Sequence, residues 1–434
     1  MSGLEELPFL LFADPEGNIY EHPELRMSGF WAMEPAPLWP DDLIPMPEFS
    51  KLFYLPGCPA VGMDPKTAEP VELKEVQIEG EELPCFAVAA FLEPGYVRTH
   101  LPAANYEAKT QILPTWAYGA VGFKDDKYWV AAFQIEYNPR WDPRNYDDRE
   151  LIEAIKAYPY SSPLVQHLSR CAVDHHCFAA KNLFLVRWEA PLPVSRVCNA
   201  SCLGCLSLQS DHLCMPSHHL IEFTPSVDEI VTIATHHLES ADKAIVSFGQ
   251  GCEGEPLTQW RLIKEAIAKI RAKTKRGTIN LNTNGSIPEK VVEIGKAGLD
   301  SVRISLNSAR AEFYHAYYRP KGYGYYDVVE SIRRCRDMGL YTMVNYLVFP
   351  GISDREAEVE ALLKLIKDTG VNFIHFKNLN IDPKLYLDKM PSDDSPIIGL
   401  KGVVEVLGQE APDVELGYFN KPVGDNKRPL PSIE

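Results

Sequence analysis

From about residue 186 onward, short runs rich in β-branched residues alternate with longer stretches whose apolar residues recur every three to four positions. No other feature constrains the fold as strongly, because this alternation is typical of strands and helices that follow one another in a parallel α/β sheet. Six strand-like runs are present, at residues 184–188 (continuing toward 197), 243–248, 278–282, 301–306, 342–348 and 372–376. The pattern predicts an α/β fold over residues 186–385. Periodicity alone leaves open whether the strands form a partial (β/α)6 barrel or an open doubly wound sheet.

Residues 1–185 have a different character, rich in proline and aromatic residues. Two alternating runs, 115–123 and 128–136, flank the polar segment Lys124-Asp-Asp-Lys127, which predicts a β-hairpin. We expect a mostly β or α+β domain here, ending in a helical segment at about 147–170. Residues 386–434 carry several prolines and glycines without strong periodicity, and we expect a C-terminal extension.

The composition argues against nucleic-acid-binding, membrane-spanning and secreted proteins. The chain has 434 residues with 43 Lys+Arg against 60 Asp+Glu, a formal net charge of −17 that works against non-specific attraction to nucleic acid or anionic membranes. No apolar stretch approaches the roughly 18 residues of a membrane span. The N-terminal segment carries acids where a secretory signal would carry positive charge, so we expect a cytoplasmic protein.

The strongest chemical signal is a group of three cysteines, Cys198, Cys202 and Cys205, spaced C-x₃-C-x₂-C directly after the first predicted strand. Three thiolates can hold three irons of a 4Fe-4S cluster and leave the fourth iron open. A structural zinc or electron-transfer cluster normally has four ligands. Cys214 is near enough in sequence to supply a fourth ligand, so spacing alone leaves a closed zinc or iron-sulfur site as an alternative.

Polar and glycine-rich segments also follow the next four predicted strands. They are Gly249-Gln-Gly-Cys-Glu-Gly254-Glu255-Pro256, Asn282-Thr-Asn284-Gly285, Arg303-Ile-Ser305-Leu-Asn307-Ser308 and Asn345-Tyr-Leu-Val-Phe-Pro-Gly351. Each is weak evidence alone, since such residues are common in turns. A tight turn whose glycines serve only to adopt positive φ is the alternative for the first segment.

Taken in order, the cysteine loop and these strand ends resemble the radical S-adenosylmethionine (radical SAM) superfamily, in particular its molybdopterin-precursor cyclase-like and peptide-modifying branch. The resemblance covers about 190 residues and implies a partial (β/α)6 barrel, a 4Fe-4S cluster on Cys198, Cys202 and Cys205, and bound S-adenosylmethionine (SAM). It implies cofactor-binding roles for a set of strand-end residues: Gly254, Glu255, Pro256, Asn284, Ser305, Asn307 and Asn345. Glu255 would accept a hydrogen bond from the methionyl ammonium, and Ser305 would face the carboxylate and ribose. The N-terminal domain resembles no family that we recognise.

The sequence departs from the family pattern at several positions. Gly204 stands where an aromatic residue usually precedes the third cysteine, and Asn307 stands where Asp is common. Cys252 lies inside the Gly-Glu-Pro loop, where a small residue filling a tight turn is the favoured interpretation. No cysteine follows Cys335, so the C-terminal cysteine-rich domain of many peptide-modifying relatives is absent from this sequence.

Further histidines and cysteines precede or follow the cysteine loop. Cys171-Ala-Val-Asp-His175-His176-Cys177 offers two thiols and two imidazoles, which could bind zinc or join Cys58 or Cys85 around a second cluster. A plain structural helix turn is the favoured interpretation. The pairs 218–219 and 236–237 are expected on solvated helix faces without a role. The aromatic segment 314–326 suggests either a loop over the barrel mouth or a solvated loop.

The sequence thus predicts an enzyme that reductively cleaves SAM to a 5′-deoxyadenosyl radical, which abstracts hydrogen from an unidentified substrate. A peptide or protein substrate is slightly favoured, because the large N-terminal domain suggests substrate or partner recognition. The alternatives are modification of a small metabolite, a glycyl-radical activase, and a non-catalytic iron-sulfur or zinc protein. The resemblance also implies an electron donor such as flavodoxin or ferredoxin. Catalytic side chains, and a second cofactor such as cobalamin, are not identified.

Overall fold

The computed structural model of the chain describes residues 3–78, 80–109, 111–208, 214, 216–424 and 429. The chain forms two compact units. Unit 1 comprises Met1–Tyr137, Leu347–Ala361 and Phe376–Glu410, and unit 2 comprises Asn138–Tyr346, Leu362–His375 and Ala411–Glu434. The division of the sequence into 1–185, 186–385 and 386–434 stays a prediction, and part of its last segment lies outside the described residues.

The N-terminal part of unit 1 is built of antiparallel strands, as the sequence predicts. Its main sheet has 11 strands: β1 Phe9–Ala13, β2 Ile19–Arg26, β5 Leu43–Pro45, β6 Lys51–Tyr54, β7 Ala60–Met63, β8 Pro70–Leu73, β11 Phe86–Phe91, β12 Tyr96–Arg98, β14 Tyr118–Gly119, β15 Val121–Lys124 and β16 Lys127–Gln134. Two smaller sheets consist of β3 Gly29–Trp31, β4 Glu34–Ala36 and β13 Leu101–Pro102, and of β9 Glu75–Ile78 with β10 Glu81–Pro84. Short 3-10 turns lie at η1 Leu4–Glu6 and η2 Pro40–Asp42. Small and branched side chains, among them Ala13, Val88 and Val130, form the core between these strands.

The predicted hairpin is confirmed. Lys124 of β15 pairs with Lys127 of β16 in an antiparallel register. The two residues between them, Asp125 and Asp126, have φ values of 52° and 55°. Two consecutive left-handed residues form the tight turn whose twist suits a two-residue hairpin, and Asp is one of the few side chains that tolerate it.

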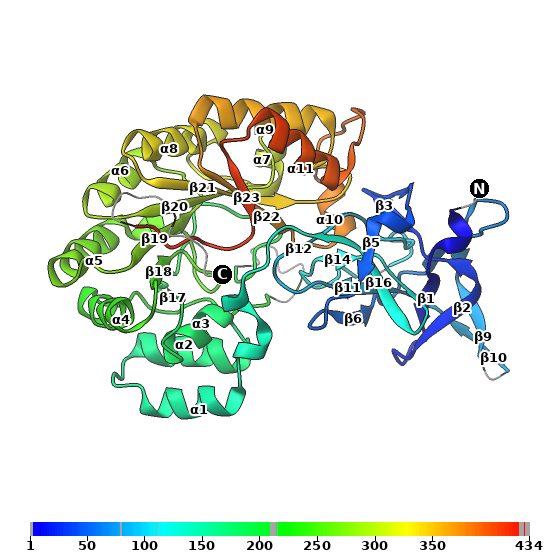
Figure 1. The fold of residues 1–434 in the computed structure, drawn as a ribbon, viewed down its shortest axis with the longest axis horizontal. Helices are drawn as coiled ribbons and strands as arrows, with labels where there is room; N and C mark the ends of the chain where they lie inside the picture. The colour runs from blue at the N-terminus through cyan, green and yellow to red at the C-terminus, as the bar shows by residue number, and fades with distance from the viewer. Residues whose placement is uncertain are drawn as a thin grey trace. The chain divides into compact units, whose positions relative to one another are not determined.

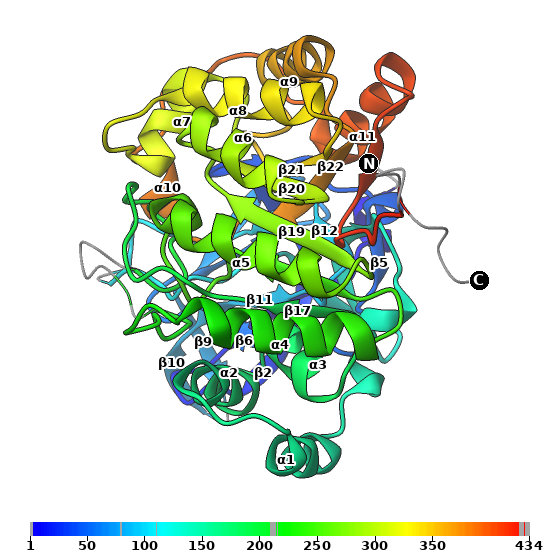
Figure 2. The ribbon, with the colours of Figure 1, turned by 90° about the vertical axis from the view of Figure 1, so that its left-hand side faces the viewer.

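Unit 2 contains most of a seven-stranded parallel sheet with alternating helices, a partial (β/α) barrel, which confirms the predicted fold class. Its strands, in spatial as in chain order, are β17 Glu189–Pro191, β18 Ile245–Phe248, β19 Thr278–Thr283, β20 Ser301–Leu306, β21 Tyr341–Val348, β22 Phe373–Asn378 and β23 Glu415–Gly417. The helices between and after them are α4 Val227–Ser240, α5 Trp260–Lys273, α6 Pro288–Lys296, α7 Ala311–Tyr318, α8 Tyr325–Asp337, α9 Glu356–Thr369, α10 Pro383–Leu387 and α11 Gly399–Glu410. Helices α4, α5, α6 and α8 line one face of the sheet (Figures 1 and 2).

Five of the six predicted strands lie within three residues of the observed bounds, because the strands are buried on both faces and therefore appear as continuous apolar runs. The prediction for 184–188 is wrong, since Phe184 ends helix α3 (Phe178–Phe184) and the strand begins only at Glu189. Four successive residues of α3, 181–184, are buried, and a fully buried helix end cannot be distinguished from a strand by periodicity. The seventh strand, β23, was missed because it has only three residues.

The predicted helical segment at 147–170 is divided in the structure. It forms α1 Asp148–Ala157 and α2 Pro163–Asp174, after the 3-10 turns η3 Pro139–Trp141 and η4 Pro143–Asn145. The break falls at Pro159, and Ser162 begins α2 by accepting a hydrogen bond from Val165 N at 3.3 Å. Among the described residues, no helix is both long and apolar enough to cross a membrane.

Candidate functional site: a cysteine loop at the strand ends

The cysteine loop follows β17 and lies against the end of α7. The backbone N–H groups of Ser201 and Leu203 donate to the carbonyls of Tyr318 and Tyr317 at 3.0 and 3.1 Å, and Lys321 N donates to Asn199 O at 2.8 Å. These bonds fix a loop that has no regular secondary structure of its own. Residues 314–326, for which a loop is expected, comprise the end of α7, the connection 319–324 and the start of α8.

The three cysteines of this loop are half-buried and close enough to influence one another. Burial raises the pKa of Cys198 to about 12, with a further contribution from the nearby carboxylate of Glu255. Burial, reinforced by Cys205 and Cys198, raises the pKa of Cys202 well above its ordinary value, while Arg319 lowers it. Three neighbouring, half-buried thiolates therefore need a cation for charge compensation, and this donor set fits a metal cluster.

The Gly-Glu-Pro loop after β18 packs directly on the segment that precedes Cys198. Gly254 N donates to Ser195 O at 2.8 Å, and Glu255 N donates to Val197 O at 2.9 Å. A Cβ atom at Gly254 would lie 2.1 Å from Val197 O, so only glycine allows this backbone contact. Pro256 is the first residue of the 3-10 helix η5 (Pro256–Gln259), where a missing N–H is tolerated.

Glu255 joins this loop to the turn after β19. Its carboxylate accepts hydrogen bonds from Leu257 N at 3.0 Å, from the Thr283 hydroxyl and from Asn284 N at 2.8 Å. The side chain is buried, and burial raises its pKa to about 7 although the three donors lower it. The protein itself thus supplies three partners for this carboxylate, which gives Glu255 a positioning role at the junction.

Asn284 connects the same turn to the cysteine loop. Its Nδ2 donates to Asn199 Oδ1 at 2.8 Å, and Asn199 Nδ2 donates to Ser286 Oγ at 2.9 Å. Because Asn199 immediately follows Cys198 in the sequence, the ends of three strands, β17, β18 and β19, are connected around the first cysteine. The sequence reasoning placed Gly254, Glu255 and Asn284 at strand ends, and the structure brings them together.

The remaining predicted residues lie on β20 and β21 or just after them. Asn345 Nδ2 donates to Ser305 Oγ at 3.2 Å, whereas the buried Asn345 Oδ1 has no hydrogen-bond partner in the described part of the chain. A buried amide oxygen without a partner is costly, which suits a position that a ligand donor would satisfy. Asn307 is fully buried and its Nδ2 donates to Phe313 O of α7 at 3.3 Å.

Sequence reasoning missed Glu253, which is central to the loop. Its two carboxylate oxygens accept four backbone N–H groups, those of Val194 and Ser195 at 2.7 and 2.9 Å and of Gly249 and Gln250 at 2.7 and 2.9 Å. Burial nevertheless raises its pKa to about 7. The only sequence signal was an acid within a glycine-rich turn, which is also a common surface pattern.

The sequence matches known proteins over this part of the chain. Residues 192–366 match the profile of the radical SAM superfamily. This part of the chain belongs to the superfamily. Radical SAM membership implies a 4Fe-4S cluster and SAM, and makes the chain a radical SAM enzyme.

Curated relatives of this radical SAM enzyme include GTP 3′,8-cyclases. That of Petrotoga mobilis is 27% identical over 234 residues, 48% of this chain and 69% of the relative. That of Thermodesulfovibrio yellowstonii is 28% identical over 41% of this chain and 53% of the relative. Molybdenum cofactor biosynthesis protein 1 of Drosophila melanogaster is 23% identical over 50% and 35%. The chain therefore spans about half or less of the length of the Thermodesulfovibrio yellowstonii and Drosophila melanogaster relatives.

Matches to solved structures have lower sequence identity than those to the curated relatives. SuiB of Streptococcus suis has 11% identity and a TM-score of 0.38, with 72% of each chain covered. The FeFe-hydrogenase maturase HydG of Carboxydothermus hydrogenoformans has 15% identity and a TM-score of 0.36, with 63% of this chain and 66% of that chain covered.

Proposed function

We propose that Cys198, Cys202 and Cys205 bind the 4Fe-4S cluster of this radical SAM enzyme and that SAM binds beside it, against the strand-end residues. The observation that carries the proposal is the hydrogen-bond network that joins Glu255 to Asn284 and Asn284 to Asn199, next to Cys198. This network connects two of the residues to which the superfamily pattern assigns a cofactor role, Glu255 and Asn284, with the loop that carries the cysteines. The other assigned positions are Gly254, Pro256, Ser305, Asn307 and Asn345.

The protein's own contribution is position and charge. A bound cluster would supply one electron to SAM, whose cleavage yields methionine and a 5′-deoxyadenosyl radical that abstracts a hydrogen atom from the substrate. Asn345 Oδ1, which has no partner among the described residues, and the Ser305 hydroxyl beside it offer an acceptor and a donor to the cofactor. Glu255 holds the Gly-Glu-Pro loop against the turn at Asn284, so that the backbone there keeps a fixed shape.

The decisive test is anaerobic reconstitution with iron and sulfide, followed by reduction with dithionite in the presence of SAM and assay for 5′-deoxyadenosine. We expect slow formation of 5′-deoxyadenosine without any added substrate. The matched control is the Cys335→Ala variant, which removes a buried thiol of α8 far along the chain from the cysteine loop. Cys335→Ala should form 5′-deoxyadenosine like the wild type. Wild-type protein that holds a reconstituted cluster but forms no 5′-deoxyadenosine would contradict the proposal.

For the substrate we propose a peptide or protein, with an electron donor of the flavodoxin or ferredoxin class. The support is the size of the antiparallel β structure over residues 3–137, an addition far larger than a small substrate requires. Stimulation of 5′-deoxyadenosine formation by the macromolecular fraction of a cell extract, abolished by protease treatment of that fraction, would agree with this proposal. Stimulation by the low-molecular-weight fraction alone would contradict it.

A nucleotide is the second candidate substrate, because the curated relatives that the chain matches include GTP 3′,8-cyclases. The excess of acidic residues, a net charge of −17, makes a polyanionic substrate less favourable. The two candidates are separated by adding GTP to the reduced, SAM-loaded enzyme. Conversion of GTP together with formation of 5′-deoxyadenosine would establish the nucleotide and exclude the peptide.

A further inference from the structure

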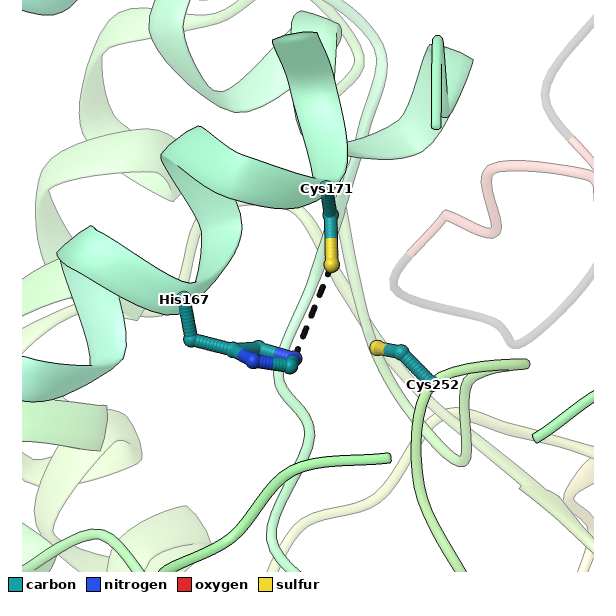
Figure 3. Close-up of side chains that lie close together, drawn as sticks. All are labelled: His167, Cys171 and Cys252. Atoms are coloured by element: carbon teal, nitrogen blue, oxygen red, sulfur yellow. Dashed lines mark hydrogen bonds between the residues drawn. The ribbon is translucent and has the colours of Figure 1, made fainter. Parts of the chain in front are cut away.

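A second group of potential metal ligands lies in unit 2, apart from the cysteine loop. His167 and Cys171 are one turn apart on α2 and face the same side, and Cys252 reaches them from the loop after β18 (Figure 3). The His167 nitrogen and the sulfur atoms of Cys171 and Cys252 all lie within 4.8 Å of one another. Cys171 and Cys252 are buried, with 2% and 5% of their surface exposed.

The spacing of these atoms fits one tetrahedral metal ion. With Zn–S bonds of about 2.3 Å and Zn–N bonds of about 2.0–2.1 Å, a tetrahedral site separates a sulfur from a nitrogen by about 3.6 Å and two sulfurs by about 3.8 Å. The distance from Cys171 Sγ to His167 Nε2 is 3.6 Å. The thiolates of a 4Fe-4S cluster bind different iron atoms and are spaced more widely, so the group suits a single ion better than such a cluster.

We propose that His167, Cys171 and Cys252 bind one zinc ion, with the fourth position left to water or another ligand. Two thiolates and one imidazole are ligands that zinc prefers, and three protein ligands with one open position is an established coordination pattern for zinc. The site requires two segments that are distant in the sequence. One is a helix that presents two ligands at i and i+4, and the other is a tight turn.

The surroundings also favour a cation. His175 stacks on His218 with ring centroids 5.7 Å apart and forms a hydrogen bond with His219. Further imidazole and thiol groups, the kinds of ligand that zinc prefers, therefore lie near the three residues, among them His175 and Cys177.

A zinc ion here would give residues 171–177 and Cys252 a role that the sequence does not predict. The sequence favoured a structural helix turn for residues 171–177 and a gap-filling role for Cys252, but it had no means of pairing the two segments. The expectation that 236–237 lies on a solvated face is also wrong, because His237 is 1% exposed and its Nε2 lies 3.1 Å from Trp188 O. A zinc ion at this site would tie α2 to the loop that carries Glu253 and Glu255.

The test is metal analysis of the anaerobically purified full-length protein by mass spectrometry. We expect about one zinc per chain in the wild type and in the Cys198→Ala/Cys202→Ala/Cys205→Ala variant, and none above background in Cys171→Ser/Cys252→Ser. His167→Ala should bind zinc at least about 100-fold more weakly, since even the loss of an outer-shell partner costs 10- to 100-fold. Cys335→Ala, which removes another buried thiol of unit 2, should keep its zinc.

A second measurement guards against misfolded variants. Zinc added to metal-stripped wild type should raise its thermal unfolding midpoint, and cobalt should give the sulfur-to-metal charge-transfer absorption of thiolate ligation. Neither change should occur with Cys171→Ser/Cys252→Ser, while circular dichroism reports whether that variant is folded.

Four outcomes would overturn the proposal. In the first two, the wild type binds no zinc although both thiols are free, or the anaerobic protein contains a Cys171–Cys252 disulfide. In the other two, zinc is lost from the Cys198→Ala/Cys202→Ala/Cys205→Ala variant, or the metal that depends on Cys171 is iron and not zinc. The readouts require no SAM cleavage, so they are independent of the proposed catalytic function.

Discussion

The two groups of cysteines in unit 2 differ in how the chain assembles them. Cys198, Cys202 and Cys205 come from eight consecutive residues of an irregular loop, which backbone bonds to Tyr317 and Tyr318 hold in place. The second group combines α2 with a turn far along the chain. The first is visible in the sequence as a motif, and the second exists only once the chain is folded. A short motif identifies a ligand set only when one segment supplies it.

The turn from Gly249 to Pro256 borders on both groups. Cys252 belongs to the second group, and two residues later Gly254 packs on the backbone that leads into the first. Glu253, between them, fixes the turn through four backbone donors. Substitutions in the cysteine groups and in this turn therefore test how independent the two groups are.

The largest effect is expected for the cysteine loop itself. Alanine at Cys198, Cys202 or Cys205 should abolish both the brown 4Fe-4S absorption and the formation of 5′-deoxyadenosine, because an iron would lose its only protein ligand. Absorption spectroscopy and product assay after anaerobic reconstitution measure the two quantities. Cys214→Ala should behave like the wild type. Loss of the cluster in Cys214→Ala, with a spectrum insensitive to SAM, would instead indicate a closed four-ligand site.

The next effect concerns the backbone contact between the turn and the cysteine loop. Gly254→Ala would place a Cβ atom 2.1 Å from Val197 O, so the two segments must separate. We expect a loss of about 3 kcal/mol in the free energy of unfolding, the upper end for overpacking, together with weak SAM cleavage. Denaturant titration measures the first quantity.

Gly251→Ala is the matched control in the same turn. A Cβ atom there would be 3.5 Å from Leu206 Cδ1, which is ordinary van der Waals contact, and the φ angle is not left-handed. This variant should remain near wild-type stability. Equal destabilisation by both variants would mean that the turn tolerates no side chain at either glycine, and that the Val197 contact has no special role.

A feature of this arrangement could be predicted when its residues lie close together in the sequence, and not when they come from distant segments. The strand ends were predictable because buried parallel strands appear as apolar runs, so polar residues after them mark the edge where loops meet. The first strand was placed too early, since Leu183 and Phe184 are equally apolar but helical. Glu253 and the pairing of Cys171 with Cys252 could not be predicted, because their partners come from other segments and carry no motif.

A smaller effect is expected at the polar residues assigned to the cofactor. Ser305→Ala should retain the cluster but bind SAM about ten- to a hundredfold more weakly, because a lost hydrogen bond to a charged group costs about 1.5–3 kcal/mol. Glu255→Ala should also weaken SAM binding, because Asn284 N and the Thr283 hydroxyl lose the carboxylate that holds the two loops together. Calorimetric titration with SAM gives the affinities. Glu265→Ala, which removes an exposed carboxylate of α5, serves as the control. Wild-type affinity in both variants would show that the cofactor pocket lies elsewhere.

The smallest effect should be a pH dependence that originates in the turn itself. Burial raises the pKa of Glu253 from 4.5 to about 7, so the folded state binds this proton more tightly than the unfolded state does. The stabilisation from the protonated acid is complete below about pH 4.5 and is lost as the pH rises through 7.

Glu253→Gln mimics the neutral acid and cannot titrate. The unfolding free energy of wild type minus that of Glu253→Gln should therefore fall by about 1–2 kcal/mol from pH 5 to pH 7, since the slope cannot exceed about 1.4 kcal/mol per pH unit. Denaturant titrations of both proteins across this range measure the difference. A difference that stays constant or grows with pH would mean that the four backbone donors outweigh burial, and that the turn beside both cysteine groups holds a permanently charged carboxylate.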